Sequence, residues 1–414
     1  MKQLPEDFIK QVKAQFCAPE AEQFLQALDT PCPISIRWND CADSVRQSGI
    51  SQDSAGQVPW CPQGEYLSQR PSFTMDPLFH AGAYYVQEAS SMFIWHLCQW
   101  LKDKGEWDSG IRALDLCAAP GGKSTLLLSV LTQGSSLIAN EIMPKRAQIL
   151  RENISKWTRQ SAADVIVTNN SPADIARLGN EIFDFILCDV PCSGEGMFRK
   201  DDEAIDDWSL QNVKMCQERQ RSIVQDIWQS LREGGFMIYS TCTYNSLEDE
   251  DNVRWIASEL GAEIISVPVP EEWNVTPSPF YHFYPHKVKG EGFFCALLRK
   301  SVADNTEGYY SHCKKKDNKS VSLNTLICGN RKGKTPILKV LPLENIYESP
   351  FVDVDSSTAL RYLHGEAIVL PSDTPRGIVT ITYKGLPLGQ AKNIGSRANN
   401  LYPKEWRIRK QTVS

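Results

Sequence analysis

The sequence lacks long apolar segments. No run in it reaches the roughly eighteen apolar residues that a membrane-spanning helix needs. The N-terminal stretch MKQLPEDFIKQVKAQF has no apolar signal core and predicts an amphipathic helix instead. We therefore expect a cytoplasmic protein with no membrane partner.

The sequence also lacks closely spaced cysteine pairs. Its thirteen cysteines are scattered, with no C-x-x-C pair among them, whereas zinc sites usually need close pairs of ligands. A reducing compartment disfavours disulfides as well. We therefore expect no metal and no disulfide, and a cysteine that takes part in chemistry acts as a thiolate.

Positive charge is scarce over the whole chain, which has a formal net charge of −6. This argues against a general polyanion binder, because phosphate contacts need Lys and Arg. The basic residues are nevertheless clustered. The segment from Arg299 to Lys339 contains ten Lys or Arg and three Asp or Glu. The segment from Lys384 to Lys410 contains seven Lys or Arg and one Asp or Glu. A nucleic-acid surface would be local and mostly C-terminal, with a solvated charged face as the alternative around Lys314 to Lys319.

The central part of the chain alternates strands and helices. From residue 111, five short apolar runs are separated by amphipathic helical segments, one of them expected from Trp208 to Leu231. The five runs are IRALDLC, SSLIANE, ADVIVTN, FDFILCDV and GGFMIYST. This alternation predicts an α/β fold, a Rossmann-like parallel sheet with both faces covered. EGFFCALLRK, at 291–300, is expected to close the sheet as an edge strand.

The length of 414 residues and the 42% hydrophobic content allow two or three domains. Short β-like runs broken by Gly and Pro predict a small C-terminal β-rich domain, in TPILKVLP, GEAIVLP and GIVTITYKGLPLGQAKNIG. A polar stretch before them suggests a linker. The predicted division is a small α+β region at 1–75, a sheet domain at 76–300, a linker at 301–325 and a β-rich domain at 326–414.

A turn of small residues follows the first predicted strand, in LDLCAAPGGKSTLLL. Gly121 and Gly122 let backbone amides approach a ligand closely at a helix N-terminus. The spacing fits neither a Walker loop nor the G-x-G-x-x-G fingerprint. Glu141 ends the next strand, where an acid can accept hydrogen bonds from ribose hydroxyls. The pair favours S-adenosylmethionine, an adenosine ligand without pyrophosphate; a tight turn that only closes a strand–helix unit is the alternative.

Two cysteines follow two other predicted strands, Cys192 in LCDVPCSGEG and Cys242 in STCTYN. In the methyl-transferring version of this sheet the two strands are neighbours, about 5 Å apart. Ligands bind beyond the carboxyl ends of such strands. Both thiols are therefore expected to flank one pocket beside the cofactor. Enzymes that methylate exocyclic amines carry Asp/Asn-Pro-Pro-aromatic where this chain has Asp189 to Cys192. Core packing is the alternative for either cysteine alone.

A thiol at this place suggests covalent chemistry on carbon. Carbon 5 of cytosine is a poor nucleophile, and adding a thiolate to carbon 6 makes it enamine-like, so that it can take a methyl group. Removal of the carbon 5 proton then expels the thiolate. A protonated Asp189 can hydrogen-bond nitrogen 3 of the ring and draw electrons from carbon 6. The base must leave any stack to reach such a pocket.

The blocks DLCAAPGGKS, NE, CDVPCSGEG and STCTYN resemble the signature of the Nol/Nop/Sun (Fmu-type) RNA cytosine-5 methyltransferases. Further segments resemble the RsmF-type ribosomal RNA members of that family. These segments are SIRWN, PWCPQGEYL, DPLFHAGAYYVQEASSMF and GQAKNIGSRANNLYPKEWRI. The resemblance covers most of the chain.

The resemblance implies roles for particular residues. Cys242 would be the nucleophile, Cys192 would assist breakdown of the covalent adduct, and Asp189 would lie between the cofactor and the base. Glu141 would hold the ribose. The loop that would hold the methionine part of S-adenosylmethionine comprises Cys117, Ala118, Ala119, Pro120, Gly121, Gly122 and Lys123. The implied substrate is small-subunit (16S) ribosomal RNA, bound partly by a C-terminal PUA-like domain, and we expect a monomer.

One block departs from the family pattern. The family carries an Asp near the adenine amine after the third strand, whereas this chain has TNNSPADI. Asn170 or Ser171 occupies that region, and Asp174 lies slightly beyond. Either the amide oxygen of Asn170 accepts the bond from adenine, or adenine recognition is looser.

Two other functions fit parts of the sequence. A tRNA or DNA cytosine-5 methyltransferase is one alternative, and in the DNA enzymes Cys192 would be the attacking thiol. A catalytically inactive, RNA-binding ribosome-assembly factor is another.

Some further residues have a structural role as the main expectation. Arg199 and Lys200 can grip RNA phosphates or form a solvated loop. General-base catalysis is the alternative to packing for the three histidines. Packing is the expected role of His80, His282, His286, Tyr402 and Trp406.

Overall fold

The structure is a computed structural model that describes residues 2–46, 50, 53–107, 109–158, 163–302, 338–343 and 350–409. The chain divides into two compact units, which are described separately. Unit 1 comprises Met1–Pro33, Glu88–Leu150 and Ala162–Leu341, and unit 2 comprises Ile34–Gln87, Arg151–Ser161 and Pro342–Ser414. The expected linker at 301–325 lies outside the described residues beyond residue 302. The division at residues 75 and 300 stays a prediction.

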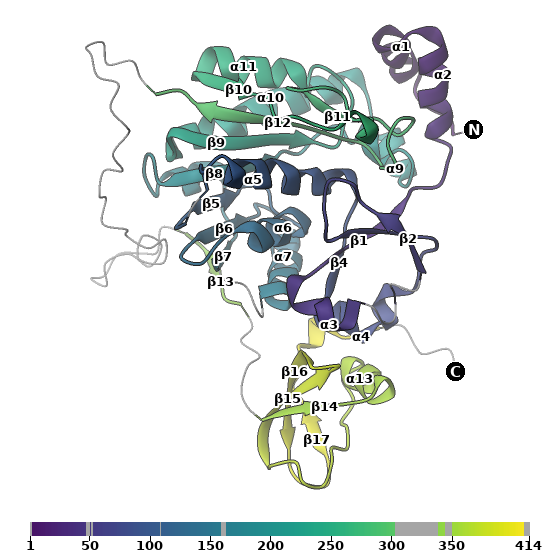
Figure 1. Ribbon diagram of the computed structural model, residues 1–414, viewed down its shortest axis with the longest axis vertical. Coiled ribbons are helices and arrows are strands. Elements are labelled where there is room, and N and C mark those ends of the chain that lie inside the picture. The colour runs from purple at the N-terminus through teal and green to yellow at the C-terminus, as the bar shows by residue number, and fades with distance from the viewer. Residues whose placement is uncertain are drawn as a thin grey trace. The chain divides into compact units, whose positions relative to one another are not determined.

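Unit 1 is built on a large mixed sheet, whose labelled strands can be followed in Figure 1. Its strands are β5 (Arg112–Asp115), β6 (Ser136–Asn140), β7 (Asp164–Thr168), β8 (Phe183–Asp189), β9 (Leu231–Thr241), β10 (Ala262–Ile265), β11 (Tyr281–Phe283), β12 (Phe293–Lys300) and β13 (Val340–Leu341). They follow the order β10-β12-β9-β8-β5-β6-β7-β13, with β11 paired to β12. The five strands from β7 to β9 are parallel, which confirms the predicted Rossmann-like fold.

Helices cover the parallel strands, as expected for a sheet buried on both faces. They are α5 (Ile94–Asp103), α6 (Gly122–Val130), α7 (Pro144–Trp157), α8 (Pro172–Ala176), α10 (Leu210–Ile227) and α11 (Glu250–Leu260). On one face α8, α10 and α11 share a core with the apolar side chains of β5, β8 and β9. α5 packs beside α6.

The N-terminal helices α1 (Glu6–Gln15) and α2 (Ala18–Ala27) form a second core of unit 1. Phe8 and Phe24 pack there with side chains from the loops that follow β8 and β9, including Phe198 and Tyr244. A short helix, α9 (Asp202–Asp206), lies in the first of these loops. The N-terminus therefore supports the loops that carry the two cysteines of interest.

Three local predictions are wrong. The helix expected to reach Leu231 ends at Ile227, and β9 begins at Leu231, because a short 3-10 turn intervenes. The strand expected at the edge, β12, is covered by β10, which is too short to stand out in the sequence. The run TPILKVLP contributes β13 to the large sheet, beside β7, and not to the small domain.

Unit 2 contains two small sheets. The first has the order β2-β3-β1-β4 and consists of β1 (Ile34–Trp38), β2 (Ser54–Gln57), β3 (Gly64–Leu67) and β4 (Tyr84–Val86). The second has the order β14-β15-β16-β17 and consists of β14 (Phe351–Asp353), β15 (Gly377–Tyr383), β16 (Leu386–Asn393) and β17 (Ala398–Asn400). The helices are α3 (Asp43–Arg46), α4 (Pro77–His80) and α13 (Ser356–Leu363). The predicted C-terminal β-rich fold is confirmed, although GEAIVLP supplies only a bridge from Ile368 to Ala398.

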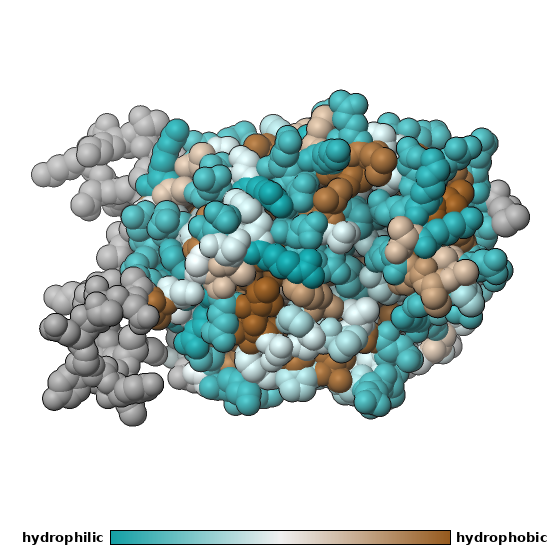
Figure 2. Space-filling model, turned by 90° about the horizontal axis from the view of Figure 1, so that it is seen from above, coloured by the Kyte–Doolittle hydropathy of each residue, from teal (hydrophilic) through white to brown (hydrophobic). Residues whose placement is uncertain are grey.

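The surface of the described residues is mixed in character. Figure 2 shows one face on which apolar residues form small groups separated by hydrophilic ones. Within the part of the chain that the structure describes, no helix combines the length and the apolar character of a membrane span.

Candidate functional site

The two cysteines lie just beyond neighbouring strands. β8 and β9 run parallel, with Asp189 opposite Ser240 in the last register position. Cys192 follows Asp189 by three residues, and Cys242 follows Ser240 by two. Because both strands end at the same edge of the sheet, the loops after them meet there. The structure confirms the prediction that the loops with Cys192 and Cys242 are adjacent.

The two thiols are in contact. Their Sγ atoms are 3.0 Å apart, and the backbone N–H of Cys242 donates to Sγ of Cys192 at 3.3 Å. The hydrogen bond with Cys242 and then burial raise the pKa of the Cys192 thiol well above its usual value. At neutral pH Cys192 therefore keeps its proton and can serve as the donor in the S–H···S contact.

Buried carboxylates hold the two cysteine loops together. Glu195, from the loop after β8, accepts the backbone N–H of Tyr244 at 2.8 Å and the side chain of Asn245 at 3.1 Å. Glu248, from the loop after β9, accepts the backbone N–H of Ser193 at 3.0 Å. Each loop thus supplies an acid that binds the backbone of the other, and this fixes the separation of the thiols.

A lysine from the glycine turn reaches the same place. Nζ of Lys123 lies 2.8 Å from Oδ2 of Asp189, whose Oδ1 accepts a hydrogen bond from Ser240 at 2.8 Å. Burial lowers the pKa of Lys123, but the charges of Asp189 and then Cys242 raise it more, so that the net shift is upward. Lys123 is therefore a cation at neutral pH, paired with Asp189.

The glycine turn itself connects β5 to α6. Gly121 precedes α6 with φ +116° and ψ 3°, a left-handed conformation that glycine adopts readily. The backbone N–H of Ala118 donates to the carbonyl of Asn140 at 2.8 Å, which ties the turn to the end of β6. Burial raises the pKa of the Cys117 thiol well above its usual value, so Cys117 is a neutral lining residue.

Glu141 lies at the end of β6, where it was predicted. Its side chain is only 3% exposed, and Oε1 accepts the backbone N–H of Met143 at 2.8 Å. Arg146 approaches Oε2 of Glu141 at 3.5 Å and donates to the carbonyl of Ala119 at 2.7 Å. One guanidinium thus links the acid to the glycine turn.

The side chain of Asn170 is already engaged. It donates to the carbonyl of Lys339 at 3.2 Å and accepts the backbone N–H of Lys339 at 3.0 Å. Asp174 and Ser171 form a reciprocal cap at the start of α8. Asn169, and not Asn170, reaches the backbone carbonyl of Glu141, at 2.7 Å. The assignment of Asn170 to adenine stays a prediction.

Several site residues were missed from the sequence. Asp115, Arg146, Glu195 and Glu248 lie beside predicted site residues, but their partners are distant in the chain. Asp115 had a recognisable signal, since it ends β5 directly before the glycine turn and is buried. Burial raises its pKa to about 7. No comparable sequence signal marks Glu195.

The remaining side chains behave mostly as packing residues. The side chains of His80, His282 and His286 are almost fully buried. Tyr402 and Trp406 lie in the hydrophobic core of unit 2, which confirms the packing prediction for these two. Arg199 donates to backbone carbonyls of Pro31 and Gly290, at 2.7 and 2.5 Å. Lys200 pairs with Glu291. Both cations thus bind protein groups at the loop after β8.

Three family models match consecutive parts of the chain. The model of 16S rRNA methyltransferase RsmB/F matches residues 103–299. The N-terminal domain of 16S rRNA methyltransferase RsmF matches residues 4–89, and the PUA domain of methyltransferase RsmF matches residues 349–408.

Curated relatives agree with these models. Ribosomal RNA small subunit methyltransferase F of Aliivibrio salmonicida (strain LFI1238) is 33% identical over 314 residues, which are 72% of this chain and 65% of the relative. This chain therefore spans slightly less than two thirds of that relative's length. The protein of the same name from Klebsiella pneumoniae (strain 342) is 28% identical over 466 residues, covering 97% of this chain and 96% of the relative.

Solved structures share the fold. A methyltransferase homolog from Pyrococcus horikoshii superposes with a TM-score of 0.60 and 25% identity, over 72% of this chain and 96% of that one. NSun6 from Pyrococcus horikoshii, solved with SFG, gives a TM-score of 0.59 and 20% identity, over 72% and 98% of the two chains.

Proposed function

Because this chain belongs to the RsmB/F family of 16S rRNA methyltransferases, we propose that it transfers a methyl group to carbon 5 of a cytosine in small-subunit ribosomal RNA. The observation that carries the proposal is the pair of thiols, 3.0 Å apart beyond β8 and β9. A single cysteine is enough to pack a strand end. Two in contact, beside a charged Lys123–Asp189 pair, support covalent catalysis on a base.

The methyl donor that we propose is S-adenosylmethionine, whose sulfonium supplies an electrophilic methyl group. The residues fit it. The start of α6, approached through the left-handed Gly121, suits the carboxylate of the methionine part. Glu141 suits the ribose hydroxyls from the end of β6. Cys117 to Lys123 would line this side of the site, and Asp189 would separate it from the base.

Cys242 is the proposed nucleophile. Its thiolate adds to carbon 6 of the cytosine, and carbon 5 becomes nucleophilic. Lys123 places a positive charge in the same site, where it pairs with Asp189. Lys123 and Ser240 engage both oxygens of Asp189, so contact with nitrogen 3 of the ring would replace one of these partners, and the ion pair with Lys123 differs from the protonated Asp189 expected from the sequence.

Cys192 is proposed to assist release. After methylation, loss of the proton from carbon 5 and expulsion of the Cys242 thiolate restore the aromatic ring. Cys192 is protonated and in hydrogen-bond contact with Cys242, so it can stabilise the departing sulfur by donating to it. The same arrangement opposes the reading in which Cys192 attacks.

Substrate binding is proposed to involve the C-terminal fold of unit 2. Its resemblance to the PUA domain of an rRNA methyltransferase supports an RNA ligand, as does the excess of seven Lys or Arg over one Asp or Glu between Lys384 and Lys410. We also propose that the protein works as a monomer in the cytoplasm.

The test is a covalent trap. Cys192→Ala protein is incubated with S-adenosylmethionine and small-subunit ribosomal RNA, and a denaturing gel is run. We expect a protein band shifted by attached RNA that disappears in the Cys192→Ala/Cys242→Ala double variant. Cys216→Ala, which removes a thiol from α10, is the matched control and should turn over without trapping.

The other outcomes are decisive as well. An adduct that needs Cys192 and survives in Cys242→Ala would exchange the two roles and favour the DNA-type mechanism. Absence of both adduct and methyl transfer on any RNA, with intact S-adenosylmethionine binding, would favour the inactive assembly factor.

A further inference from the structure

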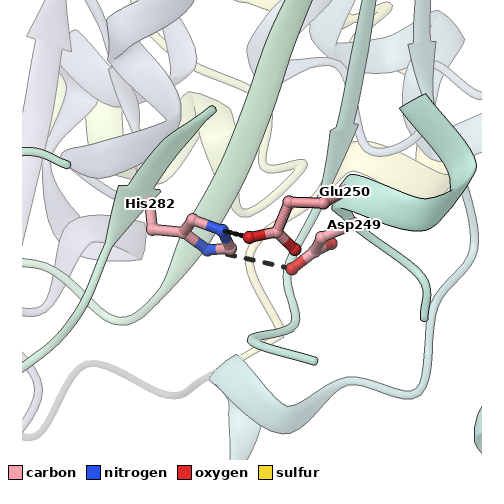
Figure 3. A group of neighbouring side chains, drawn as sticks. All are labelled: Asp249, Glu250 and His282. Atoms are coloured by element: carbon pink, nitrogen blue, oxygen red, sulfur yellow. Dashed lines mark hydrogen bonds and ion pairs between the residues drawn. The ribbon is translucent and has the colours of Figure 1, made fainter. Parts of the chain in front are cut away.

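A cluster outside the thiol pair joins two acids and a histidine. Asp249 and Glu250 lie at the start of α11, and His282 lies in β11. Figure 3 shows the three side chains directed toward one another. One atom from each lies within 4.8 Å of the others, and within the described residues this is the only such group of His, Cys, Asp and Glu.

The cluster contains buried polar atoms that the surrounding protein does not satisfy. Asp249 is fully buried and His282 is 3% exposed. Among the described residues, Oδ2 of Asp249, Oε2 of Glu250 and Nδ1 of His282 have no hydrogen-bond partner. Burying a polar atom without a partner is unfavourable, and Oδ2 of Asp249 and Nδ1 of His282, which lie 3.9 Å apart, point to a shared ligand.

The histidine is oriented as a metal ligand would be. Nε2 of His282 is 2.9 Å from Oε1 of Glu250, and the ring stacks on Tyr284 with a centroid distance of 4.9 Å and an interplanar angle of 8°. A carboxylate on one ring nitrogen leaves the lone pair of the other for a metal, which is the usual arrangement of metal-bound histidine. Here the other nitrogen is the unsatisfied Nδ1.

The spacing fits an ion better than a hydrogen bond. Nδ1 of His282 and Oδ2 of Asp249 are 3.9 Å apart, too far for direct bonding. Ligands about 2.0–2.2 Å from one tetrahedral ion lie about 3.4 Å from each other, so a closure of about half an ångström would complete the geometry. Asp249 is available, since its side chain does not cap α11.

We propose that Asp249 and His282 bind a divalent first-row transition-metal ion, with Zn²⁺ as the best fit, and that Glu250 orients the histidine ring through Nε2. Imidazole with carboxylate oxygens suits Zn²⁺ or Mn²⁺, whereas Mg²⁺ retains several waters that a buried site does not accommodate. The expectation that the protein needs no metal rested on cysteine spacing. This site instead joins residues that lie 32 positions apart in the chain.

The proposed ion has a structural task. Oδ1 of Asp249 accepts the hydroxyl of Thr241 at 2.5 Å, and Thr241 directly precedes Cys242. A metal that fixes Asp249 would therefore fix the end of β9 and the backbone that presents the thiol. It takes no part in methyl transfer, so its test is independent of the proposed function.

The test uses the whole protein in metal-free buffer. Protein stripped with EDTA is titrated with Co²⁺ and followed by visible absorption, then with Zn²⁺ by calorimetry. We expect one equivalent to bind with the spectrum of nitrogen and oxygen ligands, without the near-ultraviolet thiolate band that cysteine ligands would give.

Two variants and a matched control decide the site. His282→Gln and Asp249→Asn are expected to weaken Zn²⁺ binding at least about 100-fold. Asn at 249 keeps an acceptor for Thr241, which favours folding. His286→Gln is the control, because His286 is also buried with an unsatisfied Nδ1 but lies beside Lys287 and Glu20. It should leave binding unchanged. Failure of the wild-type protein to bind an equivalent, binding that survives both variants, or a thiolate spectrum would overturn the proposal.

Discussion

Asp115 shows how strongly a single buried acid can be perturbed beside the glycine turn. It is 1% exposed, Oδ2 accepts the hydroxyl of Ser124 at 2.6 Å, and burial raises its pKa to about 7. The unfolded carboxyl titrates near 3.9. Between these values the folded chain binds more protons than the unfolded chain, so this group makes the free energy of unfolding fall as pH rises from about 4 to about 7.

Asp115→Asn should remove that dependence. Asn keeps an acceptor for Ser124 and never ionises. The free energy of unfolding of the variant, relative to that of the wild type, should therefore rise by up to about 4 kcal/mol between pH 4 and pH 8. Urea unfolding of both proteins at pH 5 and pH 8 measures the difference. Asp103→Asn, on an exposed turn of α5, is the control and should show no such change. If the two proteins differ in unfolding free energy by the same amount at pH 5 and at pH 8, the Asp115 carboxyl is not buried in neutral form.

Glu141 allows a sharper test of the proposed cofactor site. Glu141→Ala should weaken binding of S-adenosylhomocysteine about 10- to 100-fold, the range expected for losing a charged hydrogen-bond acceptor. Calorimetry measures the affinity, and thermal unfolding checks that loss of the bond to Met143 has not unfolded the turn. Asn170→Ala is the comparison. Since its amide binds Lys339, we expect lower stability with little loss of affinity. A larger affinity loss there would place adenine on Asn170.

Site residues could be predicted from the sequence where the neighbouring residues indicate their role. Glycines mark the turn before α6, and a strand end marks Glu141. Arg146 could not be assigned, because its partner Ala119 lies 27 residues away and arginine at the start of a helix is common. Asn170 illustrates the opposite problem. Its position suggested a ligand contact, but its amide binds Lys339, directly before β13, and no local pattern indicates the pairing of that strand.

At the scale of elements, the loops after β8 and β9 approach each other at Gly196. Its backbone N–H donates to the carbonyl of Cys242 at 2.9 Å, and a Cβ there would lie 2.8 Å from that oxygen and 3.1 Å from the carbonyl of Gly292. Backbone atoms cannot give way as a flexible side chain can. Glycine at 196 is therefore needed for close approach.

Gly196→Ala should displace Cys242. We expect methyl transfer to fall at least about tenfold and stability to fall by about 1–3 kcal/mol, as for overpacking in a core. Gly235→Ala is the matched control: a Cβ there meets Leu231 at 2.8 Å and the carbonyl of Asp184 at 3.0 Å, far along β9 from the thiols. It should cost similar stability but keep the turnover of folded enzyme. Normal turnover in Gly196→Ala would show that the approach does not position Cys242.

The alternation of strands and helices was predictable because each parallel strand is a continuous apolar run between amphipathic helices. The order beyond β9 was not. β10 has four residues and half-buried side chains, so it gave no signal that would place it outside β12. Pairing of β13 with β7 depends on a return of the chain across more than 160 residues, which local patterns do not encode.

At the scale of the whole molecule, unit 2 is assembled from segments that lie far apart in the sequence. Trp38, Leu78 and Tyr84 share one core with Tyr362 and Trp406. The hydroxyl of Tyr402 lies 3.5 Å from Nδ1 of His80. The C-terminal fold thus shares one hydrophobic core with the segment that begins at residue 34, and it has no separate core within the described residues.

Cleavage of the chain between β12 and β13 should therefore leave the two fragments associated. A protease site inserted after Val302 is cut, and the product is run on size exclusion under native conditions and analysed by mass spectrometry. We expect the fragments to elute together and to separate only in denaturant, because parting them exposes the shared apolar core to water. Trp406→Ala removes a buried side chain of that core, so it should make the fragments separate at lower denaturant, whereas Phe351→Ala, at an exposed position, should not. A C-terminal fragment that elutes alone in native buffer would instead establish an independent RNA-binding module, and the basic residues from Lys384 onward would then be free to act without the rest of unit 2.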